Sequence, residues 1–294
     1  MAKNAVSKES KRYWMNTINK IDKIYSNAKI NLALRITDRL DNGYHTISTL
    51  FQEIDFHDTI EIKESTKFGF SSNNATLPDD SSNLCVVAYE MMKPFRKNNQ
   101  EYQIHLAKRI PMGAGLGGGS SNAAAILKFL NEKWEINKSK AELEEIGLKL
   151  GCDVPFFIVG GTQGGDNLGE ELIQLDFPLD YHVLLVIPKI HISTAWAYNS
   201  FSLTDRKNRY KFACLLNDNE IQWQLFENIF ENVVFQLYPE IGKIKEQLNN
   251  SGAVYSGLSG SGSTMVGIFY EKELLLKAQA SLENFFTFKS LPIR

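Results

Sequence analysis

Apolar and polar residues alternate along several short stretches of the chain. From Ile30 to Ile36 every even-numbered residue is apolar, whereas Lys29 and Asn31 begin a polar face on the odd-numbered positions. Successive side chains of a strand point to opposite faces, so this alternation predicts a strand whose polar face carries both residues. Similar alternation or short apolar runs predict further strands at 45–56, 58–63, 102–110, 156–159, 182–187 and 264–270.

Helical spacing of apolar residues fills much of the intervening sequence. Ser139 and Glu142 form a capping-box pattern, in which each side chain bonds the backbone of the other residue, so a helix should begin there and end near Leu150. The predicted helices cover 83–93, 122–130, 139–150, 221–237, 239–249 and 272–285. Strands and helices occur without strict alternation, which favours the α+β class over a doubly wound α/β sheet.

Paired glycines interrupt the pattern near the middle of the chain, at 160–161 and 164–165. A chain of 294 residues exceeds the usual size of a single core, so two linked domains are expected. We predict a flexible N-terminal extension at 1–24, a first domain at 25–165 and a second domain at 166–294.

Composition narrows the range of partners. With 22% charged residues and a net charge of −2, nothing favours nucleic acid or an anionic membrane. The longest apolar run, near 183–188, is too short to span a bilayer, and the first twenty residues lack the apolar core of a secretory signal. The three cysteines lack metal-binding or redox spacing, which predicts a cytoplasmic protein. The expected partner is a small molecule, and any self-association should be a weak homodimer.

The most informative segment is a glycine-rich loop at 111–121, with the sequence Pro-Met-Gly-Ala-Gly-Leu-Gly-Gly-Gly-Ser-Ser. It contains five of the twenty glycines and lies between the strand at 102–110 and the helix at 122–130. Glycines let backbone N–H groups approach an anion closely, and the positive end of the helix dipole favours negative charge there. The segment therefore predicts a phosphate-binding loop.

Several kinds of loop match part of this pattern. The P-loop is excluded because it needs a Gly-Lys-Ser/Thr ending, and this loop ends in Gly-Gly-Ser-Ser. Residues 113–118 match the GxGxxG pattern of dinucleotide-dependent oxidoreductases, but Lys138 stands where that pattern needs an acidic residue about twenty positions further on. A tight turn without a ligand is a further alternative, although such a turn does not require the entropic cost of five glycines.

The longer string at 111–124, which adds Asn-Ala-Ala to the loop, resembles the ATP-binding loop of the GHMP kinases, a superfamily of small-molecule kinases. The resemblance implies a two-domain fold, with an N-terminal ATP-binding domain like ribosomal protein S5 and a C-terminal α/β sandwich domain. It also implies ATP and Mg²⁺, with Ser120 or Ser121 near the metal. The implied ATP-binding residues are Pro111, Met112, Gly113, Ala114, Gly115, Leu116, Gly117, Gly118, Gly119, Ser120 and Ser121.

Further segments resemble a branch of this superfamily that phosphorylates a cytidine-diphosphate polyol. They are Ala-Lys-Ile-Asn-Leu at 28–32, Gly-Tyr-His at 43–45 and Gly-Cys-Asp-Val-Pro-Phe-Phe at 151–157, while the glycine-serine run at 257–263 resembles a third superfamily motif. The implied reaction transfers the γ-phosphate of ATP to the 2-hydroxyl of the polyol, in the non-mevalonate route to isoprenoid precursors. The alternatives are a GHMP kinase of the homoserine or mevalonate type and a nucleotide-binding module without catalysis.

The resemblance assigns roles to six residues outside the loop. Lys29 and Asp153 are the implied catalytic pair, in which Asp153 accepts the hydroxyl proton and Lys29 orients Asp153. The implied substrate-binding residues are Asn31, Tyr44, His45 and Tyr198, and the two tyrosines would enclose the cytosine. By local sequence alone, the polar face at Lys29 could be a solvated strand edge, and Asp153 could cap or brace the turn before Pro155. Tyr44 and His45 could likewise flank an ordinary turn.

Overall fold

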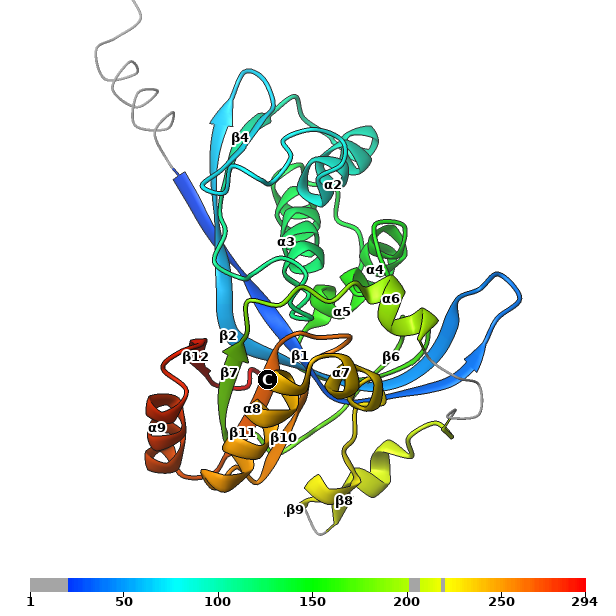
Figure 1. The fold of residues 1–294 in the computed structure, drawn as a ribbon. Helices are drawn as coiled ribbons and strands as arrows, with labels where there is room; N and C mark the ends of the chain where they lie inside the picture. Colours follow the sequence, from blue (N-terminus) through cyan, green and yellow to red (C-terminus); the bar gives the residue numbers. More distant parts are fainter. Residues whose placement is uncertain (1–20, 201–206, 218–219) are drawn as a thin grey trace, which may run out of the picture.

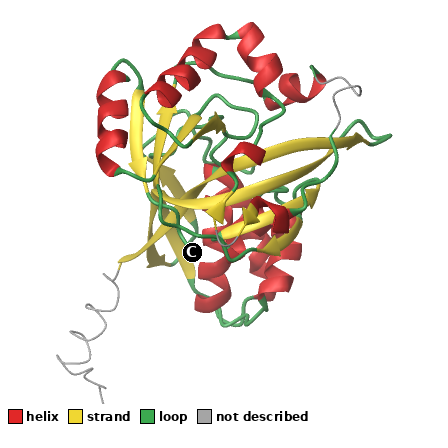
Figure 2. Ribbon diagram, turned by 90° about the horizontal axis from the view of Figure 1, so that it is seen from below, coloured by secondary structure: helices red, strands yellow, loops and turns green. Residues whose placement is uncertain are grey.

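The computed structural model describes residues 21–200, 207–217 and 220–294. They form a six-stranded sheet and a four-stranded sheet, and Figure 2 shows helices on both sides of the strands. The α+β class predicted from the sequence is confirmed. Most of the predicted extension lies outside the described residues, whereas 21–24 belong to the first strand. No helix in the described part of the chain is long and apolar enough to cross a membrane.

The six-stranded sheet is built around a long hairpin. β1 (Ile21–Arg39) pairs antiparallel with β2 (His45–Ser65), and the two blue strands run across the molecule in Figure 1. The other strands are β3 (Gly69–Ser72), β4 (Glu101–Ala107), β5 (Thr162–Asn167) and β6 (Glu171–Gln174), in the order β3-β4-β2-β5-β6. Because β5 and β6 belong to this sheet, the boundary predicted at 165 falls within β5.

The sequence predicted two strands in the region where β2 is continuous. The break expected near His57 is instead an irregularity in the pairing, because Asn27 lies opposite His57 and the next residue, Ala28, lies opposite Ile54. β2 therefore carries two extra residues at this point, and a bulge of this kind bends a strand without ending it. Lys29 follows directly after the bulge.

Four helices pack against this sheet: α2 (Leu84–Met92), α3 (Gly118–Lys133), α4 (Lys140–Leu148) and α5 (Val154–Val159). Ser139 and Glu142 form the predicted capping box at the start of α4. The strand predicted at 156–159 is wrong, because these residues are helical. A short apolar run is equally consistent with a buried helix, and Pro155 favours the first helical turn.

The four-stranded sheet has the order β10-β11-β7-β12. Its strands are β7 (His182–Ile187), β10 (Tyr255–Leu258), β11 (Met265–Phe269) and β12 (Phe286–Ser290). The helices of this half are α6 (Thr194–Asn199), α7 (Glu231–Leu237), α8 (Pro239–Asn250) and α9 (Lys272–Ser281). Short strands β8 (Leu216–Asn217) and β9 (Glu220–Ile221) pair with each other, and 3-10 turns occupy Lys93–Phe95, Phe212–Leu215 and Trp223–Leu225.

The helix predicted at 221–237 is wrong over its first part, because only Glu231–Leu237 is a regular α-helix. The amide nitrogen of Asn228 donates to the carbonyl oxygens of Leu258 and Gly260, at 2.7 and 2.8 Å. Asn228 also forms an isolated bridge with Leu34 of β1. These tertiary contacts hold the segment out of the helix that its local sequence favours.

Three hydrophobic cores stabilise the fold. The first lies between the six-stranded sheet and α2–α5, the second between the two sheets, and the third between the four-stranded sheet and α7–α9. Alternate residues of β7, beginning with Val183 and Leu184, enter the second and the third core, which explains why this strand is apolar throughout. Ala114 and Leu116 of the glycine loop also enter the second core, so this core anchors the loop.

Candidate active site

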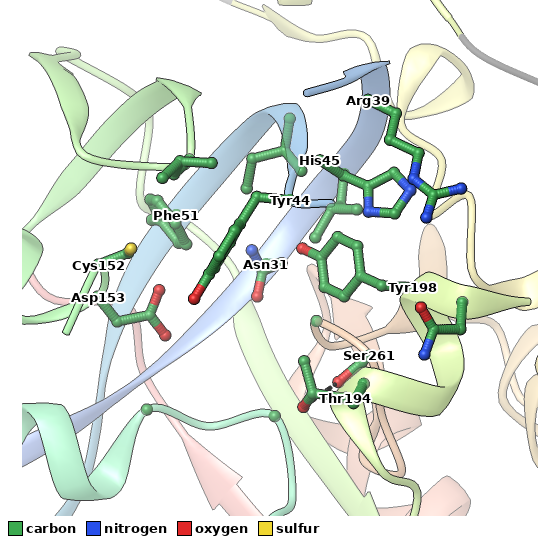
Figure 3. A pocket seen from close by; sticks show the side chains of 18 of the residues that line it. Asn31, Arg39, Tyr44, His45, Phe51, Cys152, Asp153, Thr194, Tyr198 and Ser261 are labelled. Carbon is green, nitrogen blue, oxygen red and sulfur yellow. Dashed lines mark hydrogen bonds between the residues drawn. The ribbon is translucent and has the colours of Figure 1, made fainter. Parts of the chain in front are cut away.

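A first cavity of about 690 Å³ lies between the β1–β2 hairpin, the start of α5, α6 and the glycine loop. It is lined by all six residues to which catalytic or substrate-binding roles were assigned: Lys29, Asn31, Tyr44, His45, Asp153 and Tyr198. Figure 3 shows Asn31 and Asp153 pointing into the same space as the rings of the two tyrosines. Folding thus gathers these residues from three separate parts of the chain.

Lys29 is 4% exposed, and its ammonium has two polar side chains as partners. Its Nζ donates to Asn31 Oδ1 at 2.6 Å and lies 3.6 Å from Asp153 Oδ2. A buried ammonium needs such partners, because it has lost the water that would otherwise solvate it. The Asp153 side chain is 38% exposed, so its carboxylate remains open to a ligand in the first cavity.

Asp153 occupies the N-cap position of α5 without capping the helix. A side chain at this position commonly accepts a hydrogen bond from the first N–H groups of the helix, but the Asp153 carboxylate accepts none. It faces Lys29 and the first cavity instead. The capping alternative for Asp153 therefore has no hydrogen bond to support it.

The segment 256–263 joins the second half of the chain to the site. Ser259 Oγ accepts a hydrogen bond from the backbone N–H of Asn31, at 3.3 Å, and donates to the carbonyl oxygen of Gly115, at 2.9 Å. Ser261 and Thr194 share a hydroxyl hydrogen bond of 3.0 Å in the wall of the first cavity. The segment thereby connects β1, the glycine loop and α6.

One end of the first cavity is aromatic. The ring centroids of His45 and Tyr198 are 5.4 Å apart, and Tyr44, which is 62% exposed, lines the same region. Burial, and then the charge of Arg39, lower the pKa of His45 from its usual 6.5, so its ring is neutral at pH 7. A neutral imidazole has one donor and one acceptor nitrogen. This end suits a flat ring with polar edges.

A second cavity of about 350 Å³ lies on the other side of the glycine loop. Gly115 and Gly117 line both cavities, so the loop forms the wall between them. The predicted ATP-binding residues from Pro111 to Ser120 all line the second cavity. Ser121 does not line it and is 3% exposed.

Glycine is required at two positions of this loop. Gly115 has a φ of 77°, and a Cβ there would lie 2.2 Å from the carbonyl oxygen of Ser259. Gly117, with a φ of 68°, is the N-cap residue of α3, and a Cβ there would lie 2.8 Å from the ring of Phe157. No side chain caps α3, so the N–H groups of its first turn are available to an anion in the second cavity.

Part of the wall of the second cavity comes from residues that were not predicted from the sequence. Lys108 and Asn122, which flank the glycine loop, and residues of the segment 77–85 complete its wall. A lysine at the end of the strand before a phosphate loop is a signal that could have identified Lys108. The segment 77–85 carries no comparable signal, because nothing local connects a polar loop to a glycine loop thirty residues away.

Cys152 lies beside Asp153 in the first cavity but is not suited to act as a nucleophile. Burial, and then the charges of Glu170 and Asp153, raise the pKa of its thiol. The reactive species is the thiolate, and a raised pKa keeps the thiol neutral near pH 7.

The two cavities together suit phosphoryl transfer. The second presents an uncapped helix N-terminus and one ammonium group, which favour a polyphosphate. The first presents a carboxylate and a buried ammonium on the other side of the same loop. A nucleotide in the second cavity could therefore pass its terminal phosphoryl group to a hydroxyl in the first.

Comparison with known proteins agrees with this geometry. Residues 83–161 match the GHMP kinases N terminal domain, and residues 206–287 match the GHMP kinases C terminal domain. The chain is therefore a GHMP kinase, an ATP-dependent small-molecule kinase, and the predicted two-domain fold is confirmed.

Individual relatives narrow the family further. The 4-diphosphocytidyl-2-C-methyl-D-erythritol kinase of Pelodictyon phaeoclathratiforme is 41% identical over 266 residues, which cover 88% of this chain and 92% of that protein. The enzyme of the same name from Chlorobium phaeobacteroides is 42% identical over 253 residues, covering 84% and 86%. The chain belongs to the family of the 4-diphosphocytidyl-2-C-methyl-D-erythritol kinases.

Solved structures share this fold. A crystal structure of 4-(cytidine 5'-diphospho)-2C-methyl-D-erythritol kinase has a TM-score of 0.81 at 26% identity and covers 92% of this chain and 99% of that chain. The mevalonate kinase of Methanococcus jannaschii shares the fold, with a TM-score of 0.69 at 14% identity and coverage of 94% and 99%.

Proposed function

We propose that this chain transfers the γ-phosphate of ATP to the 2-hydroxyl of 4-diphosphocytidyl-2-C-methyl-D-erythritol, a step in the synthesis of isoprenoid precursors. The observation that carries the proposal is the glycine loop shared by two cavities, with Lys29 and Asp153 on one side and the uncapped N-terminus of α3 on the other. The relatives named above support the identity of the acceptor.

The acceptor would occupy the first cavity, with its cytosine at the aromatic end and its reacting hydroxyl near Asp153. Its volume of about 690 Å³ lies in the range of small-molecule sites, and its aromatic end would take the cytosine. The exposed Tyr44 ring would stack on the base, and the neutral His45 ring would form a hydrogen bond to its polar edge. Tyr198, whose ring packs on His45, would close the other side.

The catalytic step needs position and charge more than a strong base. The transition state of phosphoryl transfer is loose, so the attacking hydroxyl keeps its proton until late. Asp153 would accept a hydrogen bond from that hydroxyl and then its proton. Lys29, held by Asn31 at 2.6 Å, would orient the Asp153 carboxylate and offset the negative charge of the transferred group.

We also propose that Mg²⁺ accompanies ATP. Ser120 suits this ion better than Ser121, because Ser120 lines the second cavity in the first turn of α3 whereas Ser121 does not line it. Magnesium usually relies on one or two protein ligands together with substrate phosphates. The ion would neutralise charge on the phosphates.

The test of this function is an ADP-release assay with the cytidyl acceptor, mevalonate and homoserine side by side. We expect turnover with the cytidyl acceptor alone, and preference for either of the others would overturn the assignment. Asp153→Asn should lower kcat by about 10²- to 10⁴-fold in a protein that still folds, since a general base contributes about that much. Near wild-type turnover by a folded Asp153→Asn variant would remove Asp153 from catalysis.

The cellular setting is proposed on separate grounds. The three cysteines are free, and Cys214 is exposed, which is compatible with the reducing cytoplasm. We propose a cytoplasmic enzyme that forms at most a weak homodimer. A monomeric mass by light scattering at micromolar concentration, with dimers only at higher concentration, would agree with this proposal, and a tight dimer would contradict it.

A further inference from the structure

Asp58 of β2 is a fully buried carboxylate to which the mechanism above assigns no role. Four donors surround it. Its Oδ1 accepts from the backbone N–H groups of Arg109 and Ile110, at 2.6 and 2.8 Å. Its Oδ2 accepts from Asn122 Nδ2, at 2.9 Å, and from the ammonium of Lys108. A buried carboxylate is tolerated only when it is paired and hydrogen-bonded in this way.

The four donors lie on the two sides of the glycine loop. Residues 108–110 directly precede Pro111, the first residue of the loop, and Asn122 directly follows Ser121, the last. A single carboxylate therefore holds both ends of the loop. Asn122 Nδ2 also donates to Ser26 Oγ of β1, at 2.6 Å, which ties the same cluster to the central hairpin.

Lys108 connects this cluster to the second cavity. Its side chain is 5% exposed, and it is the one lysine or arginine among the described residues that line this cavity. A Cβ on Gly118 would lie 2.7 Å from Lys108 Nζ, so the ammonium rests against the first residue of α3. An ammonium has three donor hydrogens, and the bond to Asp58 uses one.

We propose that Asp58 is a positioning residue for the phosphate donor. Its carboxylate holds the Lys108 ammonium against the start of α3 and fixes both ends of the glycine loop, so that the loop N–H groups and the ammonium converge on the polyphosphate. The proposal deepens the proposed function, on which it rests for the identity of the donor. It places Asp58 outside contact with either substrate.

The test uses Asp58→Asn, which keeps the shape of the side chain and removes its charge. We expect the KM for ATP and the dissociation constant for ADP to rise at least tenfold, because the loop and Lys108 lose their common anchor. The KM for the cytidyl acceptor should stay within twofold. ADP affinity is measured without acceptor, by calorimetry, so it reports on Asp58 even if the acceptor assignment fails.

A matched variant separates positioning from stability. Glu101→Gln removes a different carboxylate, which is partly buried and accepts short hydrogen bonds from the Arg96 guanidinium and the Tyr89 hydroxyl. Neither cavity is lined by these residues. Glu101→Gln should lower the unfolding temperature and leave ADP affinity unchanged. If Asp58→Asn also lowers only the unfolding temperature, Asp58 is merely structural and the proposal is overturned.

A double variant shows whether Asp58 acts through Lys108. Lys108→Met should weaken ADP binding. The double variant with Asp58→Asn should raise the dissociation constant for ADP by less than the product of the two single increases, because both substitutions remove the same Lys108–Asp58 contact. Fully multiplicative effects would contradict the proposed route. If Asp58→Asn does not fold, Asn122→Ala and Lys108→Met carry the test, and ADP affinity within twofold of wild type for both would overturn the proposal.

Discussion

Replacing Gly115 with alanine should displace the glycine loop without removing any of its polar or charged groups. The new Cβ would lie 2.2 Å from the carbonyl oxygen of Ser259, which is backbone and cannot rotate away. Carbon and carbonyl oxygen need about 3.3 Å, so the loop or the segment 256–263 must move by about 1 Å. The φ of 77° at Gly115 adds about 1–2 kcal/mol of strain for a residue with a side chain.

The displacement should be visible in catalysis. A shift of about 1 Å in a positioning element lowers the rate by about 10²-fold, or about 2.7 kcal/mol in the activation free energy. We expect this loss in kcat/KM for ATP, measured by ADP release at saturating acceptor. The unfolding free energy of Gly115→Ala should fall by at least the cost of the left-handed conformation.

Gly252→Ala is the matched control. Gly252 has a φ of 91° but lines neither cavity, and a Cβ there would meet only the end of the Leu274 side chain, at 3.0 Å. This variant should lose stability through backbone strain and keep wild-type kinetics. If Gly115→Ala retains activity within threefold while Gly252→Ala loses the expected stability, the close approach of the loop to Ser259 does not control catalysis.

Three further predictions concern the first cavity. Tyr44→Ala should raise the KM of the cytidyl acceptor roughly 5- to 150-fold, from about 1–3 kcal/mol of base stacking, and leave the KM for ATP unchanged; an unchanged acceptor KM would remove Tyr44 from the site. Because burial lowers the pKa of His45, the unfolded state binds more protons than the folded state as the pH falls below about 6.5. The wild-type protein should therefore lose stability relative to His45→Gln between about pH 6.5 and the lowered pKa. Parallel stability curves from about pH 7.5 down to the lowered pKa would refute this prediction. At about pH 8 an alkylating reagent should label the exposed Cys214 before Cys152, because the raised pKa of Cys152 keeps it a thiol. Peptide mass spectrometry reports the order of labelling. The reverse order would contradict the claim that burial keeps Cys152 unreactive.

Some features of the site were readable from single segments of sequence. The glycine loop predicts phosphate binding, because the need for φ values near 70–80° and for open N–H groups is a property of a few consecutive residues. The alternation from 29 to 36 placed Lys29 and Asn31 on one face of a strand, and the structure confirms that strand. The resemblance of short motifs then supplied the superfamily, which the comparisons confirm.

Local patterns failed where distant contacts outweigh propensity. The apolar run at 156–159 was compatible with both a strand and a helix, and it forms the helix α5, whose Phe156, Phe157 and Ile158 belong to the first core. The helix expected from 221 does not begin there, because Asn228 bonds the carbonyls of Leu258 and Gly260, some thirty residues away.

The sequence by itself predicted a phosphate-binding loop at 111–121 and placed a lysine and an asparagine on one face of a strand. Only the tertiary structure decided that Ser259 would bridge Gly115 and Asn31, which lies 228 residues before Ser259 in the chain. The tertiary structure likewise decided that Asp58 would hold both ends of the loop. The reason is physical. Periodicity and backbone conformation are fixed by neighbouring residues, whereas a buried hydrogen-bond network exists only once folding has brought its distant members together and excluded water from them.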